Sequence, residues 1–125
     1  MGTPGGKRII VADDDPDIRS LVSDVVSRAT GMELVGAAGD ADEAVRLAHD
    51  LLPDVVVLDW AMPGGGDQAA LLITKAHPSM RVVAISAMDE MEASYVMQTA
   101  GAVAFLSKPF KPAELTDVIE SAARW

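Results

Sequence analysis

Hydrophobic residues in this chain form short apolar runs that alternate with longer stretches of mixed polarity. The clearest run is Val55–Leu58, where three valines and a leucine follow one another. Such a run is typical of a strand that is buried on both faces of a parallel sheet. Four similar runs predict further strands, of which the second is less apolar and suits a sheet edge. The five expected strands cover residues 8–12, 33–37, 54–58, 81–85 and 103–106.

The stretches between these runs carry apolar residues at helical spacing, which predicts five amphipathic helices. Asp15 suits the N-cap and Pro16 the first position of the first helix. Asp40, with Glu43 three residues on, resembles a capping box. The helices are expected over about 16–30, 40–52, from the glycine loop 64–66 to His77, 90–100 and from Lys111 onward. Their inward faces are predicted as Ile18, Leu21, Val22, Val25, Val26 and Ala29; Ala44, Val45, Ala48, Leu51 and Leu52; and Leu115, Val118, Ile119 and Ala122.

This fivefold alternation predicts a fold class of α/β, a doubly wound (βα)5 domain with a five-stranded parallel sheet and right-handed crossovers. No linker, low-complexity tract or repeat longer than the βα unit interrupts it. We therefore expect a flexible N-terminal arm over residues 1–7 and a single domain over residues 8–125.

Composition narrows the class of protein. With 125 residues, half of them apolar, the chain can bury a stable hydrophobic core without disulfide bonds or a structural metal ion. It has no cysteine, which excludes disulfides, thiol chemistry and cysteine-based metal sites. The formal charge of −9 argues against direct binding of nucleic acid. No apolar run approaches the roughly 18 residues that span a bilayer, and no signal peptide is visible, so we expect a cytoplasmic protein without a membrane segment.

Polar residues follow four of the five predicted strands. Asp13 and Asp14 come after the first strand, Asp59 after the third, Ser86 after the fourth and Lys108 after the fifth. The carboxyl ends of parallel strands share one edge of the sheet, where ligands bind. Three carboxylates in one crevice repel one another, so we expect a cation between them, and their hard oxygen ligands suit Mg²⁺. A lysine and a hydroxyl suit an anion, so the set fits phosphoryl transfer to an aspartate.

Four segments resemble the signature blocks of response-regulator receiver domains. They read Ile-Ile-Val-Ala-Asp-Asp-Asp-Pro, Asp-Val-Val-Val-Leu-Asp-Trp-Ala-Met-Pro, Ala-Ile-Ser-Ala and Phe-Leu-Ser-Lys-Pro-Phe. The resemblance covers residues 8 to about 123, with order and spacing intact. It implies a flavodoxin-like fold with strand order 2-1-3-4-5 and a role as a phosphorelay receiver in two-component signalling. It also implies a signalling domain that catalyses only its own phosphorylation and dephosphorylation.

The same resemblance implies roles for individual residues at the acceptor and the metal. Asp59 would accept a phosphoryl group from the phosphohistidine of a sensor histidine kinase or phosphotransfer protein. Asp14, Asp59 and the backbone carbonyl of Ala61 would ligate Mg²⁺ directly, and Asp13 would act mainly through water.

Further residues follow from the resemblance. Ser86, the Ala87 backbone N–H and Lys108 would hold the phosphoryl oxygens, with a cis Lys108–Pro109 bond aiming the lysine inward. Ser86 and Phe105 would form a switch that alters the surface of the fourth helix, fifth strand and fifth helix, through which a homodimer could form. The downstream partner or output domain stays open.

Two other functions compete with this interpretation. A phosphatase of the haloacid-dehalogenase type could use Asp13 and Asp15 as its Asp-x-Asp pair, although it needs a late acidic cluster and usually a cap. A binding module that no longer takes phosphate is the second alternative, which the complete acceptor, metal and lysine set disfavours. Flavin binding lacks a phosphate-binding glycine loop after the first strand.

The sequence departs from the family pattern at several positions. A serine stands where threonine is more common, and Asp67 stands where glycine is common, with Gly64 to Gly66 nearby to supply backbone freedom. Ala61 and Met88 cannot hydrogen-bond an attacking water through their side chains, which predicts a long-lived aspartyl phosphate.

Other residues receive simpler interpretations. Trp60 is predicted as a partly exposed loop aromatic beside the metal. His49 and His77 are expected at exposed helix ends, away from the crevice and without a phosphohistidine role. Met88, Met91 and Met97 suit either an adaptable interface or the core.

Overall fold

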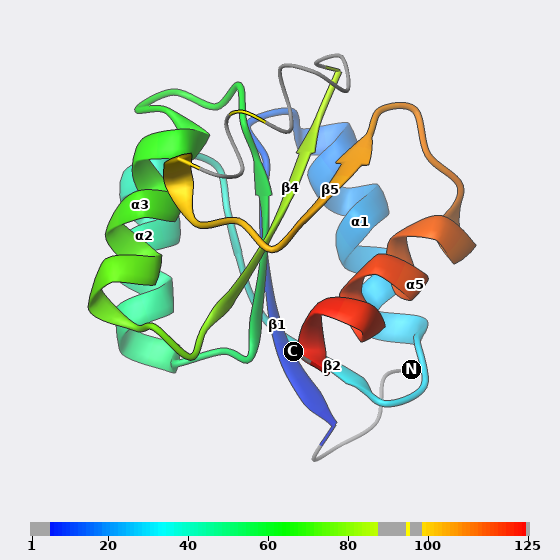
Figure 1. Cartoon of the computed structure of the whole chain (residues 1–125). Helices are drawn as coiled ribbons and strands as arrows, with labels where there is room; N and C mark the ends of the chain where they lie inside the picture. The colour runs from blue at the N-terminus through cyan, green and yellow to red at the C-terminus, as the bar shows by residue number, and fades with distance from the viewer. Residues whose placement is uncertain (1–5, 88–94, 96–98, 125) are drawn as a thin grey trace.

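The computed structural model describes residues 6–87, 95 and 99–124 and shows a parallel sheet between two helical layers (Figure 1). The sheet has five strands in the order β2-β1-β3-β4-β5, as predicted. The strands are β1 (Lys7–Ala12), β2 (Met32–Ala38), β3 (Val55–Asp59), β4 (Arg81–Ser86) and β5 (Ala104–Ser107). The described helices are α1 (Pro16–Arg28), α2 (Ala41–Leu51), α3 (Gly66–Ala76) and α5 (Pro112–Ala123). The helix expected over 90–100 lies mostly outside the described residues.

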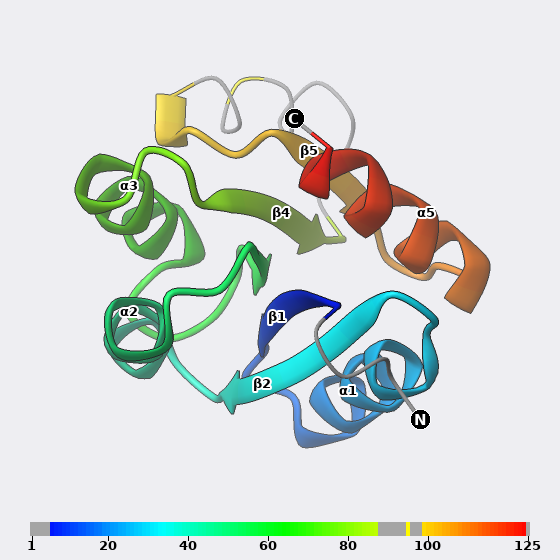
Figure 2. The same ribbon diagram turned by 90° about the horizontal axis from the view of Figure 1, so that it is seen from below.

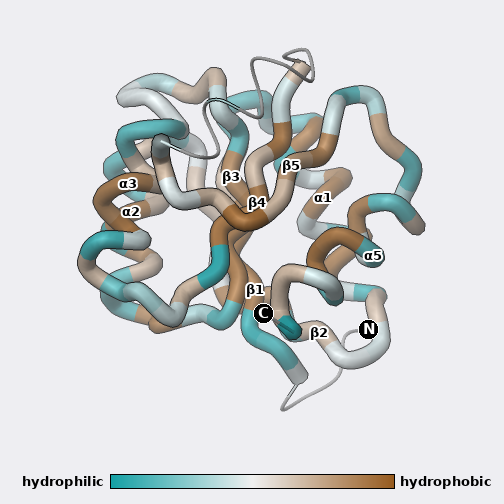
Figure 3. The backbone as a smooth tube through the Cα atoms, in the orientation of Figure 1, coloured by the Kyte–Doolittle hydropathy of each residue, from teal (hydrophilic) through white to brown (hydrophobic). Residues whose placement is uncertain are grey.

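Helices cover both faces of the sheet. Figure 2 shows α2 and α3 on one face and α1 and α5 on the other. The central strand β3 is buried along its whole length, and Figure 3 shows hydrophobic residues concentrated along the middle strands. One apolar cluster fills each side of the sheet, with Ile10, Val56 and Ile73 in one and Val22, Val57 and Ile119 in the other. This layered burial confirms the predicted fold class.

Strand boundaries differ slightly from the prediction, because backbone pairing with the neighbouring strand determines where a strand begins and ends, and apolar character does not. Lys7 was expected in the flexible arm, but it begins β1: it pairs with Met32 and its N–H donates to the Gly31 carbonyl at 2.8 Å. β2 is longer than expected for the same reason, since β1 is its partner from end to end. β5 starts and ends one residue later than predicted.

Two residues assigned to inward helical faces are exposed. Leu52 is 58% exposed, because it is the C-cap of α2 in a left-handed conformation with φ of 49° and has left the helical path. Leu21 is 49% exposed, since it lies at the margin of a face centred on the fully buried Val22 and Val26.

The helix starts follow the predicted capping chemistry. The Asp15 carboxylate accepts hydrogen bonds from the N–H groups of Asp17 (2.9 Å) and Ile18 (3.4 Å). The Asp40 carboxylate accepts from Glu43 N–H at 2.8 Å, while the Glu43 carboxylate accepts from Gly39 N–H at 2.9 Å. The second bond reaches one residue further back than in a standard capping box. Among the described helices, none has the length and apolarity that crossing a bilayer requires.

Candidate functional site

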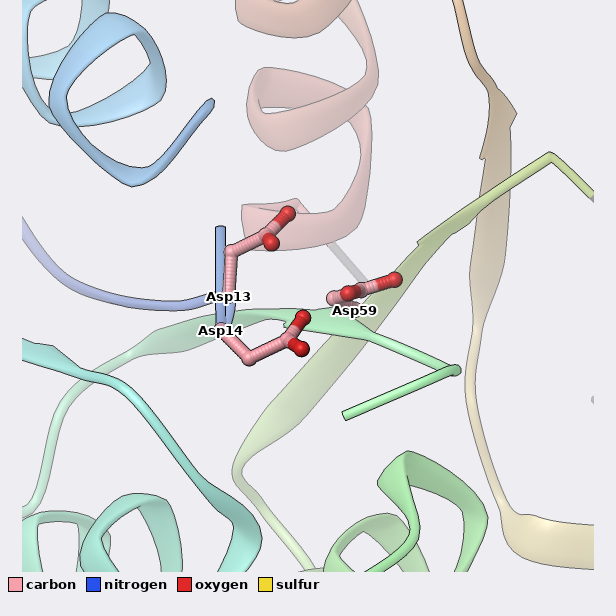
Figure 4. A group of neighbouring side chains, drawn as sticks. All are labelled: Asp13, Asp14 and Asp59. Atoms are coloured by element: carbon pink, nitrogen blue, oxygen red, sulfur yellow. The ribbon is translucent and has the colours of Figure 1, made fainter. Parts of the chain in front are cut away.

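Three aspartates meet at the carboxyl edge of the sheet (Figure 4). Asp13 and Asp14 directly follow β1, and Asp59 is the last residue of β3, its neighbour in the sheet. Each contributes a carboxylate oxygen, and these oxygens lie within 4.8 Å of one another. Asp13 and Asp59 are buried, whereas Asp14 is exposed. The structure thus brings together the three carboxylates that the sequence predicted, with one of them open to solvent.

Lys108 places a positive charge between two of these carboxylates. Its Nζ lies 3.0 Å from Asp13 Oδ2 and 3.4 Å from Asp59 Oδ1. The lysine follows β5, and its backbone N–H donates to the Ser86 carbonyl at 2.8 Å, which fixes it to the end of β4. The Lys108–Pro109 bond is cis, as predicted. The lysine therefore lies in the crevice with the acidic residues.

The electrostatics of the cluster are those of crowded, buried charges. Burial raises the pKa of Asp59 from 3.8 to about 6, helped by the negative charge of Asp13 and opposed by Lys108. Burial lowers the pKa of Lys108, but its hydrogen bond to Asp13 and the charge of Asp59 outweigh this and leave the pKa raised. Two buried carboxylates are therefore balanced by a single lysine.

This donor set fits a divalent cation with a preference for oxygen ligands. The exposed Asp14 gives access from solvent. Asp13 already accepts hydrogen bonds on both oxygens, from Asp15 N–H at 3.0 Å and from Lys108. Asp59 accepts from Ala61 N–H at 3.3 Å through Oδ1. Asp14 and Asp59 are thus better placed than Asp13 to ligate a metal directly.

Of the remaining predicted residues, Ser86, Ala87 and Ala61 lie at the same edge, whereas Phe105 lies further back in the sheet. Ser86 is the buried last residue of β4, and the residue before it, Ile85, pairs with Asp59. Ala87 follows it and is exposed. Ala61 is exposed in the turn after β3. Phe105 is a half-buried residue of β5 that pairs with Ala84 and packs against the cluster beneath α2 and α3. Met88, Met91 and Met97 lie outside the described residues.

The prediction for Trp60 is wrong. Its side chain is only 8% exposed and belongs to the apolar cluster beneath α2 and α3. Its backbone N–H donates to the Ile85 carbonyl at 3.0 Å, which extends the β3–β4 pairing past Asp59 and turns the indole inward. The indole Nε1 is buried without a hydrogen-bond partner in the described structure.

The sequence predicted that Gly64 to Gly66 supply the backbone freedom that Asp67 lacks, and the turn needs all three. A Cβ at Gly66 would lie 2.2 Å from the Asp59 carbonyl oxygen. Gly64 and Gly65 have φ of 89° and 86°, which bring the chain back toward Asp59. One residue beside the site was missed: Arg19 donates from Nη1 to the Asp13 backbone carbonyl at 2.9 Å. Its place one turn into the helix after three aspartates was the available signal.

Comparison with known proteins identifies the family. A family model described as the response regulator receiver domain matches residues 9–120. The chain belongs to the response-regulator receiver family. Receiver domains act in two-component signalling, and phosphorylation on aspartate and Mg²⁺ binding are general for them. The Asp13, Asp14 and Asp59 cluster is the part of this receiver domain that could hold the metal.

Individual relatives agree with this membership. The chain is 32% identical over 120 residues to the chemotaxis protein CheY of Thermotoga maritima, covering 95% of the chain and 99% of CheY. It is 37% identical over 118 residues to the uncharacterized transcriptional regulatory protein YxjL of Bacillus subtilis, covering 94% of the chain and 54% of YxjL. The receiver domain thus spans about half the length of several relatives that it matches.

Solved structures give the same result. The signal receiver domain of the putative response regulator NarL from Mycobacterium tuberculosis superposes with a TM-score of 0.89 at 34% identity, over 97% of this chain and 98% of that one. In this receiver domain Asp15 caps α1. Both capping hydrogen bonds are accepted by Asp15 Oδ1, so Asp15 is explained as a helix cap, which disfavours the Asp-x-Asp pair of a haloacid-dehalogenase phosphatase.

Proposed function

We propose that Asp59 accepts a phosphoryl group from the phosphohistidine of a sensor histidine kinase or phosphotransfer protein. A carboxylate oxygen of Asp59 forms the new bond to phosphorus as the P–N bond of the donor breaks, and the imidazole nitrogen keeps the bonding electron pair. The observation that carries this proposal is a buried strand-end carboxylate with two further carboxylates within 4.8 Å and a lysine at 3.4 Å. With a pKa of about 6, Asp59 is largely ionised at neutral pH and can act as a nucleophile.

Side chains around Asp59 would hold the transferred group. Lys108 lies 3.4 Å from the acceptor and would bind an oxygen of the aspartyl phosphate once that group replaces the bare carboxylate. The Ser86 hydroxyl and the exposed Ala87 N–H would bind the other oxygens, since both lie at the end of the adjacent strand. Their contribution is to fix the orientation of the phosphoryl group and to offset its charge.

Asp14, Asp59 and the Ala61 carbonyl would hold Mg²⁺ directly, and Asp13 would hold it through water. The bound ion supplies neutralisation of the phosphoryl oxygens and of the three crowded carboxylates. The Asp15 N–H would orient the Asp13 carboxylate before the metal binds, and Arg19 would hold the Asp13 backbone through its carbonyl.

Phosphorylation would be transmitted to a surface made of β5, α5 and the expected helix over 90–100. Ser86 would move toward the phosphoryl group, and Phe105 would rotate into the space that it leaves, because its half-buried position in β5 allows a second rotamer. This surface would contact a downstream protein or output domain, or a second copy of the chain. We place this signalling in the cytoplasm, without direct contact to nucleic acid.

Phosphorylation with acetyl phosphate and Mg²⁺ tests the assignment. Intact-mass measurement should show the addition of one phosphoryl group to the wild-type chain and none to Asp59→Asn. The matched control is Asp67→Asn, because Asp67 is exposed in the first turn of α3 and outside the cluster. Labelling of Asp59→Asn to the wild-type extent would refute the proposal, as would continuous turnover that depends on Asp13.

The lifetime of the aspartyl phosphate follows from Ala61. Its methyl group, next to the acceptor turn, cannot position a water for attack on phosphorus. We expect phosphate to be retained for far longer than seconds in purified protein, and Ala61→Asn to shorten that lifetime by supplying a side chain that can hold a water. The time course of mass loss after removal of acetyl phosphate measures both, and complete loss within seconds would contradict the expectation.

A further inference from the structure

The two histidines of the chain lie side by side, away from the aspartate cluster. His49 is an exposed residue in the last turn of α2, and His77 is the half-buried C-cap of α3. Their ring centroids are 5.6 Å apart, and the ring planes are inclined by 44°. The chain contains no other histidine. Residues that are far apart in the sequence are therefore brought together by the packing of two helices.

This pair lies at the opposite edge of the sheet from Asp59. The helix α2 ends just before β3 begins, and α3 ends just before β4 begins, so both histidines sit near the amino ends of the strands. Figures 1 and 2 show α2 and α3 running side by side on the same face of the sheet. Asp59 is at the carboxyl end of β3, a strand of five residues, which separates the two places by roughly 15 Å.

The geometry of the pair suits a shared metal ion. Imidazole nitrogen is a preferred ligand of Zn²⁺, Ni²⁺ and Cu²⁺, whereas Mg²⁺ prefers oxygen. A metal bound at about 2.0–2.1 Å to one nitrogen of each ring places the two centroids about 5–6 Å apart. The observed separation of 5.6 Å lies in that range.

The surroundings favour a cation as well. Both histidines sit at helix C-terminal ends, where the helix dipole places partial negative charge. At the end of α2 the Arg8 guanidinium donates to the Leu51 and Leu52 carbonyls and offsets part of that charge. The net charge of −9 adds a long-range attraction for metal ions.

We propose that His49 and His77 form a two-histidine site for one first-row transition-metal ion, with Zn²⁺ and Ni²⁺ as the ions it takes. The remaining coordination positions are filled by water. The bound ion links the C-terminal end of α2 to that of α3, and this site is chemically independent of the carboxylate site that serves phosphorylation.

The unmodified protein allows a direct test, because two histidines give only two sets of imidazole signals. Zn²⁺ is titrated into the ¹⁵N-labelled chain with excess Mg²⁺ present, and the imidazole ¹⁵N resonances are followed. Both histidines should shift together and reach their end point at one equivalent. A shift of one ring alone, or unchanged rings at one equivalent, would overturn the proposal.

Substitution provides the second test. His49→Gln and His77→Gln should each weaken the affinity for Ni²⁺ by about tenfold or more, because a single imidazole loses the advantage of a second ligand held at high local concentration. The double variant should bind no better than either single variant at this place. Asp67→Asn, an exposed residue of α3 outside both sites, serves as the control and should leave the affinity for Ni²⁺ unchanged. Equal Ni²⁺ affinity in the wild type and both single variants would overturn the proposal.

Discussion

At the scale of single residues, the proposed phosphoacceptor Asp59 destabilises the metal-free fold, because its ionised carboxylate is buried. The residue is 3% exposed, and the charge of its carboxylate lies near Asp13 and is balanced only in part by Lys108. In the absence of metal, these neighbours disfavour its ionised form, which is the form that the proposed reaction needs. Residues that are strained electrostatically in this way are common where a protein binds a cation or carries out chemistry.

The first prediction concerns the stability of Asp59→Asn. The folded chain holds the Asp59 proton up to a pKa of about 6, whereas the ordinary value is 3.8. Stability of the metal-free protein should therefore fall as the pH rises between these two values and then stay level. At about pH 7 the free energy of unfolding of Asp59→Asn should be about 1–3 kcal/mol higher than that of the wild type. Near pH 4 this difference should disappear.

Urea unfolding in the presence of a chelator measures this difference at each pH. The control is Asp67→Asn, which should change stability by only a few tenths of a kcal/mol at any pH, since Asp67 is exposed. An asparagine variant at position 59 that is less stable than the wild type at neutral pH would contradict the prediction.

The second prediction concerns Lys108. Its ammonium group lies within 3.4 Å of Asp13 and Asp59 and would repel a divalent cation at the same carboxylates. Lys108→Met should therefore raise the affinity for Mg²⁺ by about three- to tenfold, while it lowers acceptance of the phosphoryl group. Lys75→Met removes the same charge from an exposed position on α3 and is the matched control.

Trp60 fluorescence gives the Mg²⁺ affinity for this comparison. The indole directly follows Asp59 in the chain, and the second tryptophan can be removed as Trp125→Phe. Mg²⁺ should change the emission of Trp60 in that background. An unchanged or weaker Mg²⁺ affinity in Lys108→Met would show that the lysine does not compete with the metal.

At the scale of elements, the start of α3 determines the shape of the turn that follows Asp59. Gly66 begins α3 and lies directly against the backbone of Asp59 and Trp60. A Cβ at this position would lie 2.2 Å from the Asp59 carbonyl oxygen and 2.6 Å from the Trp60 Cα. These are backbone atoms of the central strand and its turn, so they cannot move aside as the end of a flexible side chain would.

The third prediction follows from this close approach. Gly66→Ala should lower the free energy of unfolding by about 2 kcal/mol or more and reduce phosphorylation, because the end of β3 must shift. Gly39→Ala is the control: its Cβ would meet only the flexible guanidinium of Arg19 at 3.0 Å. Chemical denaturation of both variants measures the cost, and equal stabilities would refute the argument.

Element boundaries also show how far sequence patterns reach. The apolar runs predicted the strands because buried strands must be apolar, and Asp15 and Asp40 marked helix starts because their carboxylates satisfy free N–H groups. The ends were less well predicted, since the extent of β2 depends on pairing with β1 and Leu52 leaves α2 through a left-handed conformation. Both depend on partners or on backbone angles that periodicity does not encode.

At the scale of the whole molecule, the aspartate cluster couples metal binding to folding. Asp13 and Asp14 follow β1 and Asp59 ends β3, so the three carboxylates converge only when these strands pair. A cation that binds the cluster therefore binds the folded chain in preference to the unfolded one.

The fourth prediction is a stabilisation by Mg²⁺. The free energy of unfolding should rise by about 1.4 kcal/mol for each tenfold increase in Mg²⁺ above its dissociation constant. Urea unfolding at constant ionic strength, with Mg²⁺ replaced by a monovalent salt, measures the rise. Asp14→Asn should reduce it and Asp59→Asn should nearly abolish it. A full Mg²⁺ effect that survives in both variants would place the cation elsewhere.

The sequence by itself determined the alternation of strands and helices and the set of residues at the carboxyl edge of the sheet. Apolar periodicity dictates which segments are buried, and parallel strands bring their carboxyl ends to one edge whatever the details of packing. That was enough to predict Asp13, Asp14, Asp59, Ser86 and Lys108 as neighbours.

Only the tertiary structure decided how these and other side chains face one another. It buried Asp13 and left Asp14 exposed, turned Trp60 into the core, and set Gly66 directly against the backbone of Asp59. It also set His49 beside His77, although neither lies near the other in sequence. The physical reason is that each of these relations depends on how segments that are distant in the sequence pack against one another. Local residue patterns do not determine that packing.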